Sequence, residues 1–158
     1  MEFTITKLIL DMRGFKPVYE ACKAIQRKIR VGILNNSEEA EIGALQHYGG
    51  TGEYTYGKYK GQKVDIPPRP FISAPVEHFG ETALKAGAES FDFTGNSADK
   101  VLNAVGSAMA TQIKALMNMN GVYPPPNSER TVETKGFDHP LIDTGKLRDS
   151  ITYEVDEK

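Results

Sequence analysis

The sequence predicts a small α+β domain, in which a small mixed or antiparallel sheet packs against two to three helices, one of them long. Three observations lead to this fold class. Apolar residues alternate with polar ones near both ends of the chain, the period of strands with one buried face. Apolar residues three and four positions apart lie between these ends, as in helices with one buried side. The length of 158 residues fits one domain over 1–158, large enough to bury a core.

Strands are predicted at the start, near residue 30 and at the end of the chain. Phe3 and Ile5 indicate an opening strand, and residues 30–34 a short buried one. From Ser150 onward every second residue is apolar, which predicts a strand docked into the sheet. Between the first two strands, the spacing of four apolar residues predicts a helix over 17–30: Val18, Cys22, Ile25 and Ile29.

Three further helices are expected. Ser37 is a good N-cap, the glutamates after it suit the positive end of a helix dipole, and Gly49 and Gly50 end this helix. A second helix is expected over 75–90. The clearest covers 97–120 and carries an apolar stripe with several methionines. Filling the core is the favoured interpretation of these methionines, over an adaptable binding surface.

Composition and charge narrow the classes of function. There are 19 basic and 21 acidic side chains, so the net charge of −2 gives no overall attraction for nucleic acid or anionic membrane. The single cysteine, Cys22, excludes an intrachain disulfide and is expected to be a buried thiol. No apolar run approaches the roughly 20 residues that cross a bilayer, so we expect a soluble protein without an export signal.

Two segments are predicted to be irregular. Residues 48–64 combine glycine, tyrosine and lysine and suggest an extended Tyr-rich β-hairpin arm. Residues 121–140 hold a Pro-Pro-Pro run and suggest a long loop, a feature that is usually functional or disordered in a compact domain. Because tyrosine is favoured in interfaces, we expect the arm to contact a neighbouring subunit. The candidate assembly interface comprises Tyr54, Tyr56, Tyr59, Lys60 and Tyr123.

No residue pattern predicts catalysis, a metal site or a cofactor. His47 has no partner histidine four residues away, and there is no cysteine cluster. The glycines at 49–52 lack the following Lys-Ser/Thr of a phosphate loop, and no serine lies in a nucleophile elbow. We therefore expect a non-enzymatic protein in which His47 has a structural role.

The segment 66–71 reads as a rigid strut. Its three prolines fix φ and remove three backbone donors, so it cannot form a central strand. The planar guanidinium of Arg69, held between prolines, suits a carboxylate or carbonyl contact, and Phe71 is expected to anchor the strut in the core. A polyproline ligand for a recognition domain is the alternative interpretation.

The segment 139–153 compresses a cap, a short helical turn and a strand into fifteen residues. Asp143 or Thr144 is expected to cap the turn, and Leu147 and Ile151 to supply apolar contacts. It contains no arrangement of groups that could run a reaction, which favours a scaffold.

Taken in order, three motifs resemble the tail-completion and virion-morphogenesis proteins of tailed bacteriophages. They are Leu-Gln-His-Tyr-Gly at 45–49, Ile-Pro-Pro-Arg-Pro-Phe at 66–71 and Pro-Leu-Ile-Asp-Thr-Gly-Lys-Leu-Arg at 140–148, the last followed by Ser150 and Ile151. The resemblance extends from about residue 15 to the end. Its structural motif residues are His47, Gly49, Pro67, Pro68, Arg69, Pro70, Phe71, Leu141, Asp143, Thr144, Gly145, Leu147, Ser150 and Ile151.

This resemblance implies a structural virion protein, made in the host cytoplasm, that acts in tail completion or head-to-tail joining at the neck. It implies a homo-oligomeric ring, with a hexamer expected, around the DNA channel. The partners would be other copies, neighbouring neck and tail proteins and genomic DNA passing through without sequence-specific binding, with no membrane and no cofactor. Tail terminator and head stopper remain alternative roles.

A different class of function also stays open. The tyrosines and lysines of the arm would suit a nucleic-acid-binding module, with rings stacked on bases and ammonium groups on phosphates. Such binding would weaken steeply with salt. A small hydrolase would need a partner for His47 that the sequence does not reveal.

Overall fold

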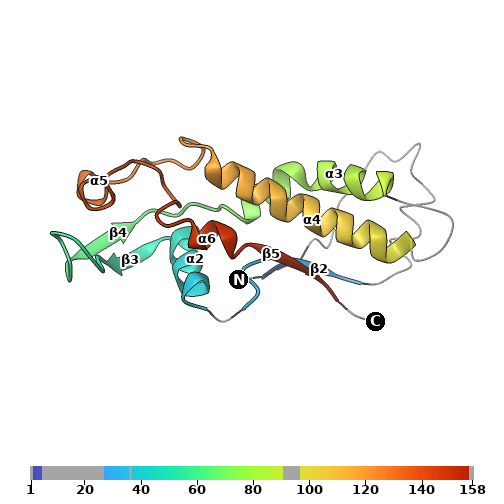
Figure 1. Cartoon of the computed structure of the whole chain (residues 1–158), viewed down its shortest axis with the longest axis horizontal. Helices are drawn as coiled ribbons and strands as arrows, with labels where there is room; N and C mark the ends of the chain where they lie inside the picture. Colours follow the sequence, from blue (N-terminus) through green and yellow to red (C-terminus); the bar gives the residue numbers. More distant parts are fainter. Residues whose placement is uncertain (1, 5–26, 36, 91–96, 157–158) are drawn as a thin grey trace.

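The computed structural model is elongated and describes residues 2–4, 27–35, 37–90 and 97–156 (Figure 1). A three-stranded sheet, the long helix α4 and the helix α3 lie in successive layers. A two-stranded arm projects from one end of the molecule, away from these layers. The α+β prediction is confirmed. In chain order the elements are β1 (Glu2–Thr4), β2 (Ile29–Gly32), α2 (Glu38–Tyr48), β3 (Gly50–Glu53), β4 (Lys63–Ile66), α3 (Ser73–Glu89), α4 (Ser97–Asn118), α5 (Glu129–Lys135), α6 (Lys146–Asp149) and β5 (Thr152–Val155).

The main sheet has the order β1-β2-β5, and both pairings are antiparallel. In the central strand Val31 lies opposite Phe3 on one side and Tyr153 on the other. The predicted helix end at residue 30 was wrong, because Ile29 and Arg30 belong to β2. The two-residue alternation of Ile29, Val31 and Ile33 prevails over the helical spacing, as expected for β-branched residues. The rest of that predicted helix, with Cys22, lies outside the described residues.

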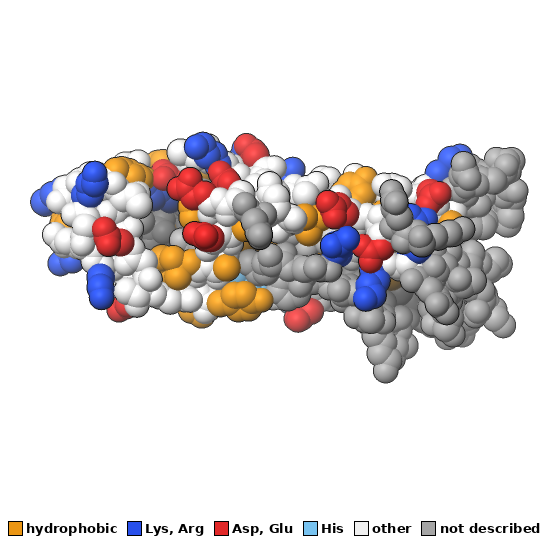
Figure 2. All heavy atoms as spheres, turned by 90° about the horizontal axis from the view of Figure 1, so that it is seen from below, with side chains coloured by type: hydrophobic (Ala, Val, Ile, Leu, Met, Phe, Trp, Pro, Cys, Tyr) orange, Lys and Arg blue, Asp and Glu red, His pale blue; other side chains and the backbone are white. Residues whose placement is uncertain are grey.

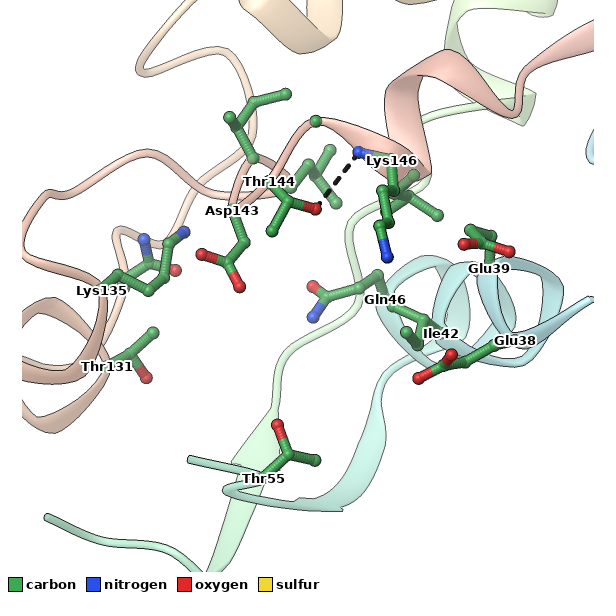
Figure 3. A pocket seen from close by; sticks show the side chains of 15 residues that line it. Glu38, Glu39, Ile42, Gln46, Thr55, Thr131, Lys135, Asp143, Thr144 and Lys146 are labelled. Carbon is green, nitrogen blue, oxygen red and sulfur yellow. Dashed lines mark hydrogen bonds between the residues drawn. The ribbon is translucent and has the colours of Figure 1, made fainter. Parts of the chain in front are cut away.

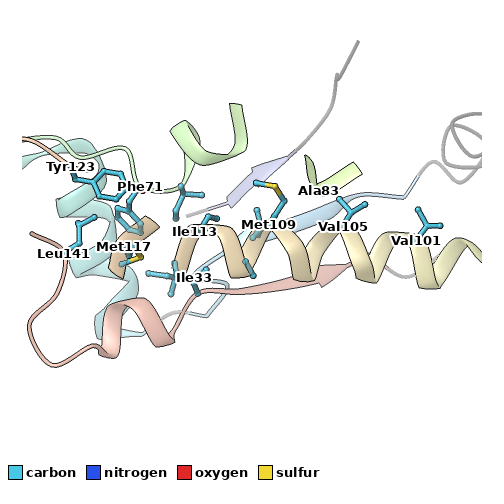
Figure 4. Close-up of a cluster of buried hydrophobic side chains, with 14 residues drawn as sticks. Ile33, Phe71, Ala83, Val101, Val105, Met109, Ile113, Met117, Tyr123 and Leu141 are labelled. Atoms are coloured by element: carbon cyan, nitrogen blue, oxygen red, sulfur yellow. The ribbon is translucent and has the colours of Figure 1, made fainter. Parts of the chain in front are cut away.

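The long helix α4 forms the centre of the core (Figure 4). One of its faces is buried at every fourth residue, and none of these five side chains is more than 2% exposed: Val101, Val105, Met109, Ile113 and Met117. At 1.5 Å per residue its 22 residues span about 33 Å, so α4 supports both α3 and the sheet along most of the molecule. Met109 and Met117 fill the core as predicted, whereas Met119 is exposed.

Two glycines allow the layers around α4 to approach closely. A Cβ atom on Gly106 would lie 2.3 Å from Cδ2 of Tyr153, so α4 packs its bare backbone on the ring from β5. A Cβ on Gly87 of α3 would lie 2.4 Å from Cγ2 of Val105. Both separations are far below a normal contact, and glycine is therefore required for this packing.

The arm is the antiparallel pair β3 and β4, which extends two residues beyond the predicted arm of 48–64, because Ile66 pairs with Gly50. It follows α2 directly, because Gly49 ends that helix with φ 75° and ψ 172°. A Cβ on Gly49 would lie 2.9 Å from both the Ile66 carbonyl oxygen and the Pro68 nitrogen. The arm is thus fixed to α2 through a position that only glycine fits.

The segment predicted as a long loop contains a helix. The two-turn helix α5 is capped by Ser128, whose hydroxyl accepts from the Thr131 amide at 3.3 Å, and it ends at Gly136 with φ 81°. Both caps are ordinary helix signals, and only the proline run before them favoured a loop. In the described part of the chain, no helix is both long and apolar enough to cross a membrane.

Candidate functional site

The first two motifs meet along α2. The backbone amide of Arg69 donates to the Gln46 carbonyl at 2.9 Å, which aligns the proline strut with the end of the helix. Phe71, fully buried, meets the His47 ring edge-on at a centroid distance of 5.4 Å. The strut therefore places Phe71 in the core as predicted. The Arg69 amide makes the kind of backbone hydrogen bond that the neighbouring prolines cannot donate.

His47 is 3% exposed, and its Nε2 lies 3.3 Å from the Ser73 hydroxyl at the start of α3. Burial lowers the pKa of His47 from its ordinary value, because desolvation disfavours the imidazolium. The described residues hold no cluster of three or more His, Cys, Asp or Glu side chains that could bind a metal ion. His47 thus connects α2 to α3 as a neutral core side chain.

Arg69 ties the strut to two other segments. It is 4% exposed, and its Nη1 and Nη2 donate to Gln46 Oε1 at 3.3 Å and to the Pro125 carbonyl at 2.9 Å. The predicted carbonyl contact is confirmed, with the proline run of 124–126 as the partner. Burial lowers the pKa of Arg69, while Asp138 acts in the opposite direction. A planar two-branched donor of this kind holds the loop in one place.

The third motif packs against the other side of α2. A Cβ on Gly43 would lie 2.7 Å from Ile33, 3.3 Å from Leu147 and 3.7 Å from Phe71, so the second and third motifs both approach α2 at Gly43. The expected cap needs correction, because α6 begins after Gly145 with φ 86° and has no side-chain cap. The Thr144 hydroxyl instead accepts weakly from the Lys146 amide at 3.4 Å.

Two other features shape this motif. Leu141 has φ 67°, a left-handed conformation that is uncommon for a side chain of this size, yet it is buried in the core cluster. Ser150 closes α6 by donating from its hydroxyl to the Leu147 carbonyl at 2.7 Å, and Ile151 follows at 1% exposure. The motif is thus a tight corner that directs the chain from the surface of α2 into β5.

The arm is held by tyrosine hydroxyls. Tyr54, 9% exposed, lies 3.4 Å from the Ser128 hydroxyl and 3.2 Å from that of Thr131, while Tyr59 donates to Glu133 at 2.7 Å. These contacts place α5 along the arm, as Figure 1 shows. Two of the tyrosines predicted to contact other subunits thus bind within the chain, to a helix in the segment predicted as a loop.

The remaining residues of the candidate interface differ in position. Tyr123 is 8% exposed and belongs to the core cluster, so its assignment to a surface was wrong; burial raises its pKa to about 12. Val122 and Tyr123 resume the apolar pattern of α4 after Gly121 and thereby enter the core. Lys60 lies exposed at the tip of the arm. Tyr56 is 44% exposed and donates to Asp143 at 2.7 Å.

A groove of about 360 Å³ opens where α2, the arm, α5 and the third motif meet (Figure 3). Apolar side chains of Ile42, Leu141 and Leu147 line it together with polar and charged ones. Ile42 is 43% exposed, on a different side of α2 from the residues that the helix buries, Gly43 and His47. Its charged lining residues are Glu38, Glu39, Lys135, Asp143 and Lys146.

Comparisons of the chain with protein-family models, with curated proteins and with solved structures found no match.

Proposed function

We propose that the chain is a structural, non-enzymatic virion protein of a tailed bacteriophage, acting in tail completion or head-to-tail joining at the neck. It works there as a ring of identical subunits, with six expected, around the DNA channel. The basis is the resemblance of the three ordered motifs to the tail-completion and virion-morphogenesis proteins.

One observation supports this function best: polar side chains and glycines of the three motifs form contacts inside the fold that support a projecting arm. Arg69 holds the proline loop, Gly49 fixes the arm to α2, and Asp143 receives the Tyr56 hydroxyl. These contacts join segments that are distant in the sequence, which suits a structural role. A rigid body with a preformed arm is what repeated subunit contacts need, because little order is lost on assembly.

The nucleic-acid alternative has less support from the arm. Stacking on bases requires exposed ring faces. Tyr54 is buried, and the ring of Tyr59 has the Lys58 ammonium 5.0 Å and the Arg130 guanidinium 5.3 Å from its centroid. Tail terminator and head stopper stay as roles of the same class, since all three need a ring of small subunits.

The test is negative-stain imaging of particles from a phage lysate that lacks this gene product. Separate DNA-filled heads and finished tails are the expected result, and supplying the wild-type chain from a plasmid should restore joined, infectious particles. Intact infectious particles without the product would overturn the neck function. Tails of uncontrolled length would instead support a tail terminator.

A further inference from the structure

We propose that the groove beside α2 receives the arm tip of a second copy of this chain, with Lys60 of that copy placed against Glu38 and Glu39. This inference rests on the proposed ring and names the surfaces that would form it. The groove and the tip lie on different parts of the same chain, so one contact joins two unlike surfaces.

The groove offers an apolar floor and an acidic rim. Ile42 exposes 43% of its surface there, between buried Leu141 and half-buried Leu147. Glu38 and Glu39 stand at the edge, on the first turn of α2 (Figure 3). Among the residues that the structure describes, neither glutamate forms an ion pair.

The other charges of the groove are largely engaged by the fold. Asp143 accepts from Tyr56, and the Lys135 ammonium donates to the His139 carbonyl at 2.8 Å. Lys146 is the remaining cation, opposite two glutamates. The lining thus holds the carboxylates of Glu38, Glu39 and Asp143 against the ammonium groups of Lys135 and Lys146, an excess of negative charge that suits a cationic occupant.

The arm tip is a preformed cationic turn. The Tyr54 amide donates to the Gln62 carbonyl at 3.1 Å and the Gly61 amide to the Tyr54 carbonyl at 2.9 Å, which closes the turn. Lys58 lies 3.6 Å from Glu133 of its own chain, whereas exposed Lys60 has no ion pair among the described residues. Figure 2 shows basic side chains gathered around the arm end and acidic ones nearer the middle of this face.

The tip cannot fill the groove of its own chain. Thr55, inside the turn that Tyr54 and Gln62 close, already forms one wall, and the hydroxyl of Tyr56 fixes that side of the turn to Asp143. Glu38 lies at the far end of α2 from the arm, about 16 Å away along the 11-residue helix. The arm projects away from α2 (Figure 1). A tip in the groove must therefore belong to another copy, and such a head-to-tail contact repeats from copy to copy and forms a ring when its rotation closes.

The test uses charge reversal in the full-length chain, with self-association measured by sedimentation velocity up to about 1 mM. Lys60→Glu alone and Glu38→Lys alone should each weaken self-association by about tenfold or more, since like charges then face each other. An equimolar mixture of the two variants should recover to within about threefold of wild type, because each tip then meets an opposite charge. The controls are Lys85→Glu and Glu77→Lys on α3, which should change the strength of self-association by less than about twofold.

Three outcomes would overturn this inference: a wild-type chain that stays monomeric at about 1 mM, a mixture that fails to recover, or controls as damaging as the test pair. Loss of DNA binding in Lys60→Glu with unchanged self-association would also overturn it, in favour of a nucleic-acid contact. The proposed function can be judged separately. Joined heads and tails without the gene product would refute the neck role, whatever the mixing experiment gives.

Discussion

The hydroxyl of Tyr56 donates a 2.7 Å hydrogen bond to Oδ2 of Asp143, a residue 87 positions further along the chain. The bond joins the arm to the corner that leads into β5. Desolvation first, and then the bond to Asp143, raise the pKa of Tyr56 to about 12, so the hydroxyl stays protonated at neutral pH. The angle at which the arm leaves the body thus depends on a contact that is partly exposed to solvent.

Tyr56→Phe should loosen the arm without unfolding the protein. The ring stays and only the hydroxyl is lost, and a bond this exposed contributes less than about 1 kcal/mol to the free energy of unfolding. Amide exchange in β3 and β4 should become at least about threefold faster, because local opening no longer breaks this bond. Tyr153→Phe, which removes a 3.3 Å bond to Asn103 far from the arm, is the control and should leave arm exchange unchanged.

Gly49→Ala should destabilise the protein more than Gly121→Ala. Both glycines have positive φ, 75° and 81°, and with ψ 172° Gly49 lies in a region that is essentially restricted to glycine, where an alanine costs about 1–3 kcal/mol in backbone strain. At Gly49 the new methyl would also lie 2.9 Å from backbone atoms of Ile66 and Pro68, whereas nothing lies within 4 Å at Gly121. Urea denaturation measures the difference in free energy of unfolding. Equal losses in the two variants would contradict the close approach.

Gly106→Ala should cost about 1–3 kcal/mol of the free energy of unfolding, as expected for overpacking. The added methyl would lie 2.3 Å from the Tyr153 ring and would push β5 off α4. The check is a double-mutant cycle with Tyr153→Ala, which removes the ring. If the two losses simply add, with a coupling below about 0.5 kcal/mol, the two residues do not oppose each other as described.

Arg69→Lys should be damaging although the charge is kept. One ammonium cannot reproduce the two donors that reach Gln46 and Pro125, so a buried acceptor loses its partner. We expect a loss of about 1–3 kcal/mol in the free energy of unfolding, with faster amide exchange around 127–128. Exposed Arg130→Lys should stay within about 0.5 kcal/mol. If Arg69→Lys lowered the free energy of unfolding as little as Arg130→Lys, the strut would not depend on the two donors of the guanidinium.

Acidification should destabilise the protein through His47. Its pKa in the folded protein lies below the ordinary value of 6.5, so between these two values the unfolded chain binds more protons. The stability present above pH 6.5 is then lost as the pH falls toward the lowered pKa. Melting temperatures from about pH 7.5 to about pH 5 should fall more steeply for wild type than for His47→Gln. If the melting temperatures of the two proteins fell equally with pH, protonation of His47 would not account for the loss of stability in acid.

The sequence predicted the parts of this fold that rest on local periodicity and caps. Ser37 and Gly49 bound α2, and the four-residue spacing of α4 placed its buried face. It also predicted a carboxylate or carbonyl partner for Arg69, because the planar guanidinium suits either, and the partner is a carbonyl. The partner itself, Pro125, could not be named, since it lies 56 positions away and no local pattern links the two.

Three features of the structure were not predicted from the sequence: the burial of Tyr123, the helix α5 and the groove. Tyr123 reads as an exposed aromatic beside a proline run, and only the packing of the chain after α4 buries it. The helix α5 was missed although Ser128 and Gly136 bracket it, because the preceding prolines favoured a loop. The groove could not be predicted at all, since it depends on the simultaneous placement of α2, the arm and the third motif.

The sheet order also sets the sequence of events during synthesis. β2 receives its second partner only from residues 152–155, and Arg27 binds the Asp156 carbonyl across 129 positions. A ribosome therefore has to translate almost the whole described chain before the edge of β2 is covered. Pairings this distant slow folding, because loop closure precedes any gain from contact. Nascent chains that stall before β5 would expose a strand edge to one another, so the yield of native protein should depend on translation speed and on chaperones.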